Sequence, residues 1–179
     1  MGFSESHILS KVALACLPIG CLFVIIGTAT DNWYSYTLDS LGVSQSYSSG
    51  LWKVCFESIC ASIDEGVAGL RVTVPAYMQA TRVFAILSIL LAAGGTTVMV
   101  LAIIRNEYKP LQIFAIVAPA CAALCAFIAV AVYGGEYESN IPAVAKQLIK
   151  LSWSFALTVV GGFIDAFSAV LFSVSFFKS

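Results

Sequence analysis

Four long apolar stretches constrain this chain more than any other feature, because each can cross the hydrocarbon core of a bilayer, which takes about 20 helical residues. They cover residues 12–30, 83–104, 111–133 and 151–177. Backbone N–H and C=O groups in a bilayer must be paired within the protein, so such stretches fold as helices. The sequence therefore predicts an all-α membrane fold, with residues 1–179 forming one domain built on a bundle of four transmembrane helices.

The first stretch has a second interpretation, as a signal peptide. The small residues Thr28, Ala29 and Thr30 form a cleavage-like site at its end. However, the apolar run is longer than the hydrophobic region of most signal peptides, and Pro18 and Gly20 lie inside it. These features favour an uncleaved first helix.

The composition agrees with a membrane location and argues against several functions. Only 11% of the residues are charged, against about 25% in soluble domains. The formal net charge of −1 gives no basic surface for nucleic acid. The sequence contains no Ser/His/Asp grouping, no glycine-rich phosphate loop and no histidine-rich tract. We therefore expect no enzyme, no catalytic residue, no cofactor and no metal site.

Two polar loops, residues 31–79 and 134–150, are expected on one side of the bundle. Four short segments of the longer loop have the aromatic, β-branched or alternating character of strands. They cover residues 33–38, 44–48, 51–56 and 60–63. Turn-forming Asp, Ser and Gly residues separate them, so the loop is predicted to form a small antiparallel β-sheet.

Cys55 and Cys60 are the two cysteines in a polar segment. In an oxidising compartment they can cross-link a tight β-hairpin. The alternatives are two free thiols, or a zinc site, for which a four-residue spacing without a second pair is poor. The remaining cysteines lie in the apolar stretches, where Cys behaves as a small hydrophobic residue. They are Cys16, Cys21, Cys121 and Cys125.

The distribution of positive charge predicts the orientation in the membrane. Four spans place both termini and the 105–110 link on one side. That side carries four cations within a short length of chain, namely Lys11, Arg105, Lys109 and Lys178. The other side carries five over a much longer length, namely Lys53, Arg71, Arg82, Lys146 and Lys150. The density of positive charge, together with the disulfide argument, places both termini in the cytoplasm and the loops outside.

Two charged residues at the spans have more than one interpretation. Asp165, in the middle of the fourth stretch, is a candidate helix-contact residue, with a charge-dependent function as the alternative. Arg82 opens the second stretch and could pair with Asp31, cap the loop domain, or extend to water. The small-residue segments 94–97 and 161–162 resemble helix-packing contacts, with a pore lining as the weaker alternative.

Several residues carry a family resemblance. Trp33 follows the first span, Gly50-Leu51-Trp52 precedes Cys55 and Cys60, and Gln79-Ala80-Thr81-Arg82 enters the second span. This pattern resembles the claudin and peripheral myelin protein superfamily. The close spacing of the cysteines, with segments 29–33 and 152–155, is most similar to the epithelial membrane proteins and the lens fibre membrane intrinsic protein.

The resemblance implies a left-handed four-helix bundle under an extracellular β-sheet, with the two loop cysteines joined and no catalysis. It implies a multi-pass plasma-membrane protein that acts at cell–cell junctions, including tight junctions, or in adhesion and membrane organisation through its extracellular loops. Its expected partners are the lipid bilayer, further copies of itself in the same or the opposing membrane, and related four-span proteins. Claudins usually end in a scaffold-binding cytoplasmic tail, which we do not expect of Phe177-Lys178-Ser179.

Two alternative functions belong to the same superfamily. One is an auxiliary subunit that modulates an ion channel. The other is a channel-forming claudin whose acidic loop residues select ions between cells. A solvated loop surface explains those acidic residues equally well. They are Glu57, Asp64, Glu65, Glu136 and Glu138.

Overall fold

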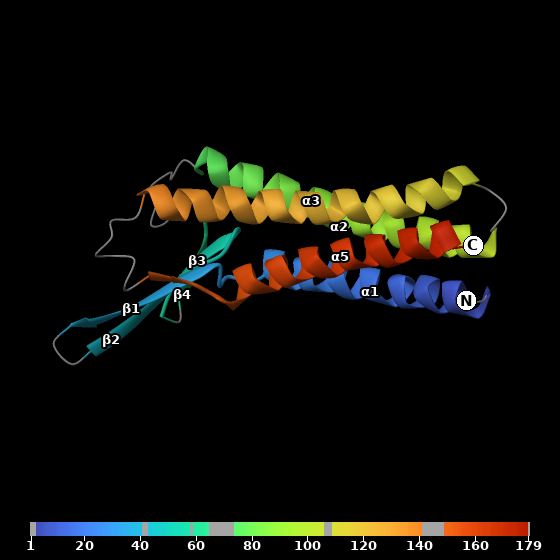
Figure 1. Ribbon diagram of the computed structural model, residues 1–179. Coiled ribbons are helices and arrows are strands. Elements are labelled where there is room, and N and C mark those ends of the chain that lie inside the picture. Colours follow the sequence, from blue (N-terminus) through green and yellow to red (C-terminus); the bar gives the residue numbers. More distant parts are fainter. Residues whose placement is uncertain are drawn as a thin grey trace.

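The computed structural model describes residues 3–40, 43–57, 59–64, 74–105, 109–140 and 149–178 (Figure 1). Among these residues, four helices form the bundle, and their bounds are α1 Phe3–Ala29, α2 Ala76–Ile104, α3 Lys109–Asn140 and α5 Trp153–Lys178. Each contains a segment long and apolar enough to cross a membrane. Both termini, the end of α2 and the start of α3 lie at one end, with a β-sheet at the other (Figure 1). The predicted four-helix membrane fold is confirmed.

Two of the helices extend beyond the apolar stretches from which they were predicted. α2 begins at Ala76 rather than at residue 83, and α3 continues to Asn140 rather than ending at residue 133. This corrects the predicted loop 134–150, because residues 134–140 are helical and residues 141–148 lie outside the described part. Hydropathy detects the part of a helix in the hydrocarbon core, whereas helical hydrogen bonding continues into the polar boundary region.

Mostly small residues line the inside of the bundle, at alternating spacings of three and four. On α5 the buried positions begin at Ser154 and Thr158 and continue through Gly161, Asp165 and Ser168. α2 repeats the pattern with a second stripe, which is Met78, Thr81, Ala85, Ser88, Ala92, Gly95, Met99 and Ala102. A spacing of 3.5 residues is typical of left-handed helix packing. Large apolar side chains such as Leu90 and Phe114 face outward, as lipid contact requires.

The closest helix contact is the antiparallel seam between α1 and α5. A Cβ atom added at Gly161 would lie 2.7 Å from Val24 Cγ2 and 2.8 Å from the Gly20 carbonyl oxygen. A hydroxyl bridge lies on the termini side of this crossing, where Ser168 Oγ donates to the Ala13 carbonyl oxygen at 2.8 Å. Backbone contact and polar bridges together fix the position of α5 on α1.

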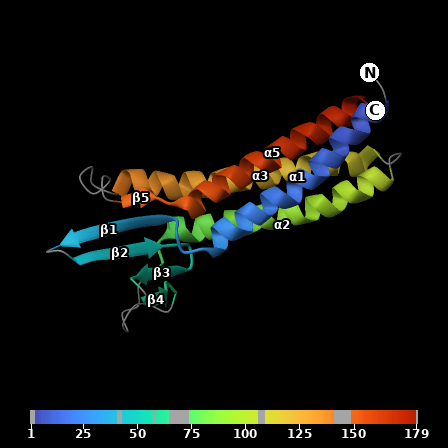
Figure 2. The ribbon, with the colours of Figure 1, turned by 90° about the horizontal axis from the view of Figure 1, so that it is seen from below.

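The sheet has five antiparallel strands in the order β4-β3-β2-β1-β5 (Figure 2). Their bounds are β1 Tyr34–Ser40, β2 Val43–Ser49, β3 Lys53–Phe56, β4 Ile59–Ser62 and β5 Ile149–Leu151. The four predicted strands are present with shifted ends. β5 was not predicted. It pairs with β1 just before α5 begins, so the sheet is joined to the last helix as well as to the first.

Replacing Gly161 with Val tests the close seam. We expect this change to lower the free energy of unfolding by about 1–3 kcal/mol, the usual cost of overpacking, because the new side chain meets the α1 backbone. Gly94→Val is the matched control, since a Cβ at Gly94 has no atom within 4 Å among those the structure describes. Thermal unfolding in detergent measures both. Equal destabilisation by the two variants would contradict a glycine-dependent seam.

Candidate functional site

Trp33 is the centre of the junction between sheet and bundle. Its side chain is fully buried, and its indole Nε1 donates a 2.7 Å hydrogen bond to the Gly27 carbonyl oxygen in the last turn of α1. The ring packs edge-on against Tyr133 of α3, with centroids 4.8 Å apart, and against Phe155 of α5 at 5.8 Å. Each such aromatic contact contributes about 0.5–1.5 kcal/mol beyond area burial. One side chain thus joins three helices.

The Gly50-Leu51-Trp52 segment lies on the same junction. Leu51 is fully buried beside Trp33 and Tyr133, and Trp52 Nε1 donates to the Thr28 carbonyl oxygen at 3.0 Å. Gly50 is required by close approach, because a Cβ there would lie 2.6 Å from both Asp31 Cα and the Thr30 carbonyl oxygen. The motif therefore brings the β2–β3 turn directly onto the end of α1.

Arg82 holds the same turn from the α2 side. Its Nε donates to the Leu51 carbonyl oxygen at 2.8 Å, its Nη1 pairs with Asp64 Oδ1 at 2.8 Å, and its guanidinium lies 4.6 Å from the Trp52 ring centroid. The Arg82 side chain is 11% exposed and that of Asp64 is 50% exposed. Of the interpretations left open by the sequence, capping of the loop domain is the one observed. The carboxylate partner is Asp64, and Asp31 was the wrong candidate.

A disulfide joins Cys55 to Cys60 across the β3–β4 hairpin, as predicted. The two residues are direct register partners, and the turn between them includes Glu57 with a φ of 52°. No group of three or more His, Cys, Asp or Glu able to hold a metal occurs among the described residues. A closed loop this short stabilises the folded state by about 2 kcal/mol on the chain-entropy model. The bond therefore fixes the edge of the sheet farthest from β5.

Asp165 lies away from this junction, in the middle of the bundle. It is fully buried on the α1–α5 seam, where a Cβ added at Gly20 would overlap its Oδ1 atom. Neither carboxyl oxygen has a hydrogen-bond partner among the described residues. Its predicted role as a helix-contact residue thus remains a proposal, one that its position between α1 and α5 supports. The two adjacent glycines nearby contact different helices. Gly161 lies against α1, whereas Gly162 lies against Phe127 and Ala126 of α3.

A row of aromatic and aliphatic side chains, called the apolar row below, crosses the sheet from β1 to β4. Direct pairing aligns Tyr36 with Tyr47, Tyr47 with Phe56, and Phe56 with Ile59, so all four residues share one face. The Tyr36 and Tyr47 rings stack at 4.7 Å, whereas Phe56 and Ile59 are 44% and 75% exposed. Burial raises the pKa of both tyrosines above the usual value of 10, and a hydrogen bond with Tyr34 adds to the shift at Tyr47. The row therefore stays uncharged at physiological pH.

The sequence did not identify every residue of the junction. Tyr133 and Phe155 enclose Trp33. From the sequence, Tyr133 was assigned only to an apolar stretch, and Phe155 was used as part of the family resemblance without this contact being predicted. A Tyr at the end of a predicted span is a usable signal, because aromatic residues with a polar tip favour the membrane boundary. The acceptor carbonyls of Gly27 and Thr28 carried no signal, since any residue provides a carbonyl oxygen.

The bundle, the disulfide-linked sheet and the tryptophan junction define a class, that of multi-pass membrane proteins with four spans and a sheet at one membrane face. The sequence profile of the PMP-22/EMP/MP20/Claudin family matches residues 6–172. The chain therefore belongs to this family.

Curated relatives include the lens fiber membrane intrinsic protein of several mammals. The protein of Rattus norvegicus is 34% identical over 94 residues, which is 52% of this chain and 47% of the relative. That of Bos taurus is 35% identical over 82 residues, covering 46% and 40%. The matched segments thus span about half the length of these relatives or less. The protein of Homo sapiens is 26% identical over 170 residues, covering 91% of this chain and 88% of the relative.

Substitutions at Arg82 and Asp64 distinguish the contribution of the backbone cap from that of the ion pair. Arg82→Lys keeps the charge but cannot reproduce the planar fork that reaches the Leu51 carbonyl, Asp64 and the Trp52 ring together. We expect it to cost about 1–2 kcal/mol, whereas Asp64→Asn removes only a half-exposed ion pair and should cost less than about 1 kcal/mol. Chemical unfolding followed by tryptophan fluorescence measures both. A larger effect from Asp64→Asn would mean that the ion pair, rather than the backbone cap, holds the turn.

Proposed function

We propose that this protein is a non-enzymatic organiser of cell–cell contacts in the plasma membrane, with its sheet outside the cell and both termini in the cytoplasm. It associates through the sheet with copies of itself or with related four-span proteins. The observation that carries the proposal is the apolar row of Tyr36, Tyr47, Phe56 and Ile59. It lies on a sheet that hydrogen bonds attach to the ends of the helices.

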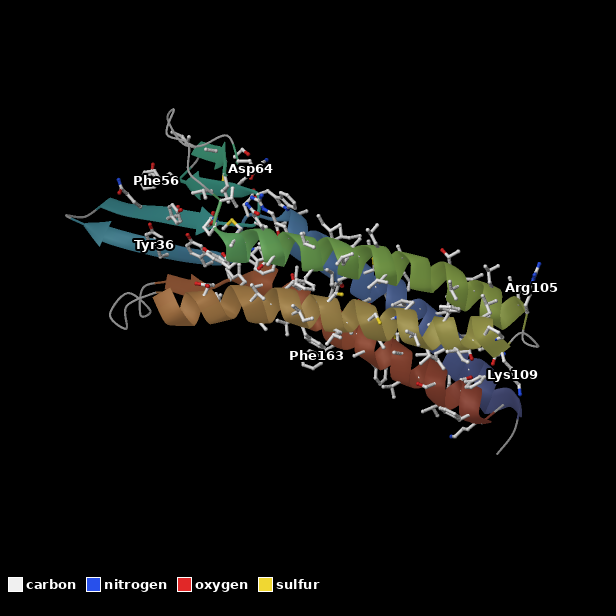
Figure 3. All side chains as sticks on the ribbon, turned by 90° about the horizontal axis from the view of Figure 1, so that it is seen from above. Tyr36, Phe56, Asp64, Arg105, Lys109 and Phe163 are labelled. Atoms are coloured by element: carbon white, nitrogen blue, oxygen red, sulfur yellow. A yellow bond between two sulfur atoms is a disulfide. The ribbon has the colours of Figure 1, made fainter. Side chains whose placement is uncertain are left out.

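Charge and redox chemistry support the orientation. Arg105 and Lys109 lie at the end of the bundle opposite the sheet (Figure 3), and positive residues near spans favour the cytoplasmic side. The Cys55–Cys60 disulfide lies at the sheet end, and disulfides persist in oxidising compartments outside the cytosol. Both arguments support an extracellular position for the sheet.

The apolar row has the properties of an interaction surface. Phe56 lies on the sheet beyond the helix ends (Figure 3), and the stacked tyrosines beside it provide a rigid aromatic platform. Such residues are enriched in the core of protein–protein interfaces because they bury much area at little conformational cost. The junction at Trp33, Trp52 and Arg82 fixes the sheet in place, so binding does not have to order it. The relatives are named as intrinsic membrane proteins of lens fibres, which agrees with a membrane location for this chain.

The acidic residues fit ion selection less well. The Asp64 carboxylate is paired with Arg82, which lowers its availability to a passing cation. Glu57 is exposed at the β3–β4 turn, while Glu65 and Glu138 lie outside the described side chains. The described acidic residues therefore give little support to ion selection between cells, and the auxiliary-subunit role is the contrary outcome of the expression test below.

Expression in non-adherent cells tests the contact function. The wild-type protein should concentrate where two expressing cells touch. A Phe56→Ser, Ile59→Ser double variant should lose this concentration while reaching the cell surface, because it removes the exposed part of the apolar row. Lys53→Gln is the matched control, since Lys53 is exposed on the opposite face of the same strand. Even distribution of the wild type, with co-purification of a channel pore subunit, would replace this function with the auxiliary-subunit one.

Epitope tags test the orientation separately. A tag at either terminus should be inaccessible to antibody in intact cells and accessible after permeabilisation, because both termini are expected in the cytoplasm. A tag inserted in the 65–73 segment should be accessible without permeabilisation. Staining of an N-terminal tag on intact cells would reverse the proposed orientation.

A further inference from the structure

Tyr36 of β1 and Tyr47 of β2 form the closest tyrosine pair among the described residues. They are direct register partners, and their rings stack with centroids 4.7 Å apart and an interplanar angle of 27°. The other tyrosine pairs are wider. The rings of Tyr34 and Tyr47 are 6.0 Å apart, and those of Tyr77 and Tyr133 are 6.1 Å apart at an angle of 67°. Two phenol rings are therefore best placed to react with each other at the Tyr36–Tyr47 stack.

The register determines which atoms of the two rings meet. Side chains at opposite positions of an antiparallel pair have Cβ atoms about 4.5–5.5 Å apart and extend from the same face of the sheet. The Tyr36 and Tyr47 rings therefore extend side by side and are nearly parallel. In this arrangement the ring carbons next to each hydroxyl group, the ortho carbons, face those of the other ring.

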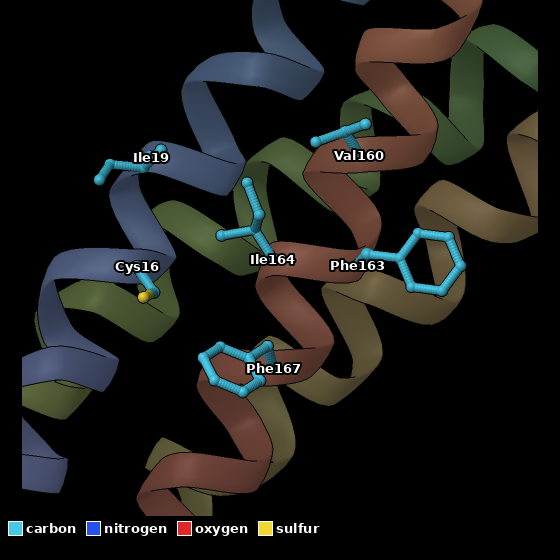
Figure 4. Close-up of a pocket in the computed structure, with 6 residues that line it drawn as sticks. All are labelled: Cys16, Ile19, Val160, Phe163, Ile164 and Phe167. Carbon is cyan, nitrogen blue, oxygen red and sulfur yellow. The ribbon is translucent and has the colours of Figure 1, made fainter.

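The stack is accessible from water, whereas the free cysteines are not. Both tyrosines are partly exposed, and Tyr36 lies on the sheet beyond the helix ends (Figure 3). The four free cysteines lie within the spans, and Cys16 lines an apolar hollow on the outer side of the α1–α5 seam (Figure 4). Cys55 and Cys60 are already joined. A water-soluble oxidant therefore reaches the two tyrosines without meeting a free thiol of the described residues.

We propose that the Tyr36–Tyr47 stack is an oxidative cross-linking site, at which a one-electron oxidant such as the ferryl haem of a peroxidase joins the two rings as dityrosine. Each phenol gives one electron to the oxidant and its hydroxyl proton to water, which leaves two phenoxyl radicals. A carbon–carbon bond forms between one ortho carbon of each ring. The hydrogen atoms on those two carbons then move to the oxygens, which restores both phenols. Two electrons pass to two equivalents of oxidant, and two protons are released to water.

This bond joins the pair of strands that the disulfide does not connect. The Cys55–Cys60 bond links β3 to β4. β1 and β2 are paired through their backbones along their whole described length. A covalent link between strands restricts the unfolded chain, as a disulfide does. Oxidation at the stack therefore fixes the relative position of the two strands that carry the tyrosine half of the apolar row.

Peptide mapping after oxidation tests the proposal. The full chain in detergent micelles is treated with peroxidase and hydrogen peroxide, the disulfide is reduced, and the protein is cut with a protease specific for Asp. Cleavage before Asp31, Asp39 and Asp64 places the two tyrosines in different peptides, residues 31–38 and 39–63. We expect these peptides to be recovered joined to each other. Their combined mass should be lower than the sum by two hydrogen atoms, with the fluorescence of dityrosine.

Phenylalanine variants locate the bond. Tyr36→Phe and Tyr47→Phe should each lower the yield of joined peptide to the background level, because each keeps the stacked ring but removes the hydroxyl group needed for the radical. Tyr77→Phe is the matched control and should leave the yield unchanged, since Tyr77 packs at the junction and not in the stack. Tyr34→Phe should retain most of the yield, because the 31–38 peptide still contains Tyr36. Thermal unfolding checks that every variant is folded.

Three results would overturn the assignment. Full yield in Tyr36→Phe, with loss in Tyr34→Phe, would move the coupling to the Tyr34–Tyr47 pair. Joined chains on a denaturing gel, in place of peptides joined within one chain, would mean that tyrosines of two copies react. Absence of joined peptide, under conditions in which a free tyrosine-containing peptide couples, would mean that the stacked rings do not react with each other.

Discussion

The final carbonyl groups of α1 are the constraint on which the rest of the structure depends. A helix leaves its last four carbonyls without intrahelical partners, and unpaired backbone groups at a membrane boundary are costly. Here the Gly27 and Thr28 carbonyls accept hydrogen bonds from the Trp33 and Trp52 indoles, and the Ile26 carbonyl accepts one from the Thr30 N–H. The two indole donors belong to the residues directly before β1 and β3. The same two indole hydrogen bonds therefore pair carbonyl groups at the end of α1 and attach the sheet to that helix.

This arrangement explains why the sheet can project from a bundle that has little polar surface of its own. The Trp33 backbone also accepts from the Ser152 N–H and donates to the Ser49 carbonyl, which ties the start of β1 to α5 and to β2. Arg82 adds a contact from α2. Contacts from all four helices converge on the β1 start and the β2–β3 turn, and the small-residue seam between α1 and α5 keeps those helix ends close together. The position of the apolar row follows from this rigid base.

Much of this organisation could be predicted from the sequence, because its signals are local. The spans follow from uninterrupted hydropathy, and the strands and the Cys55–Cys60 bond from the composition of one polar loop. What could not be predicted depends on tertiary contact. The three residues of β5 become a strand by pairing with β1, and Asp64 becomes the partner of Arg82 because the β4 end returns to α2. The extension of α3 to Asn140 lies where side chains are polar, so hydropathy does not report it.

Hydrogen–deuterium exchange of a Trp33→Phe variant tests the central claim most directly. The change keeps an aromatic ring in the junction but removes the N–H that reaches the Gly27 carbonyl. If this bond couples the sheet to the bundle, leaving the carbonyl unpaired should cost about 1–3 kcal/mol. Amides of β1 and β2 should then exchange about tenfold faster or more, while amides in the middle of α3 keep their wild-type rates. Trp153→Phe, at a residue 48% exposed, should change neither. Wild-type exchange in the sheet of the Trp33→Phe variant would contradict the account.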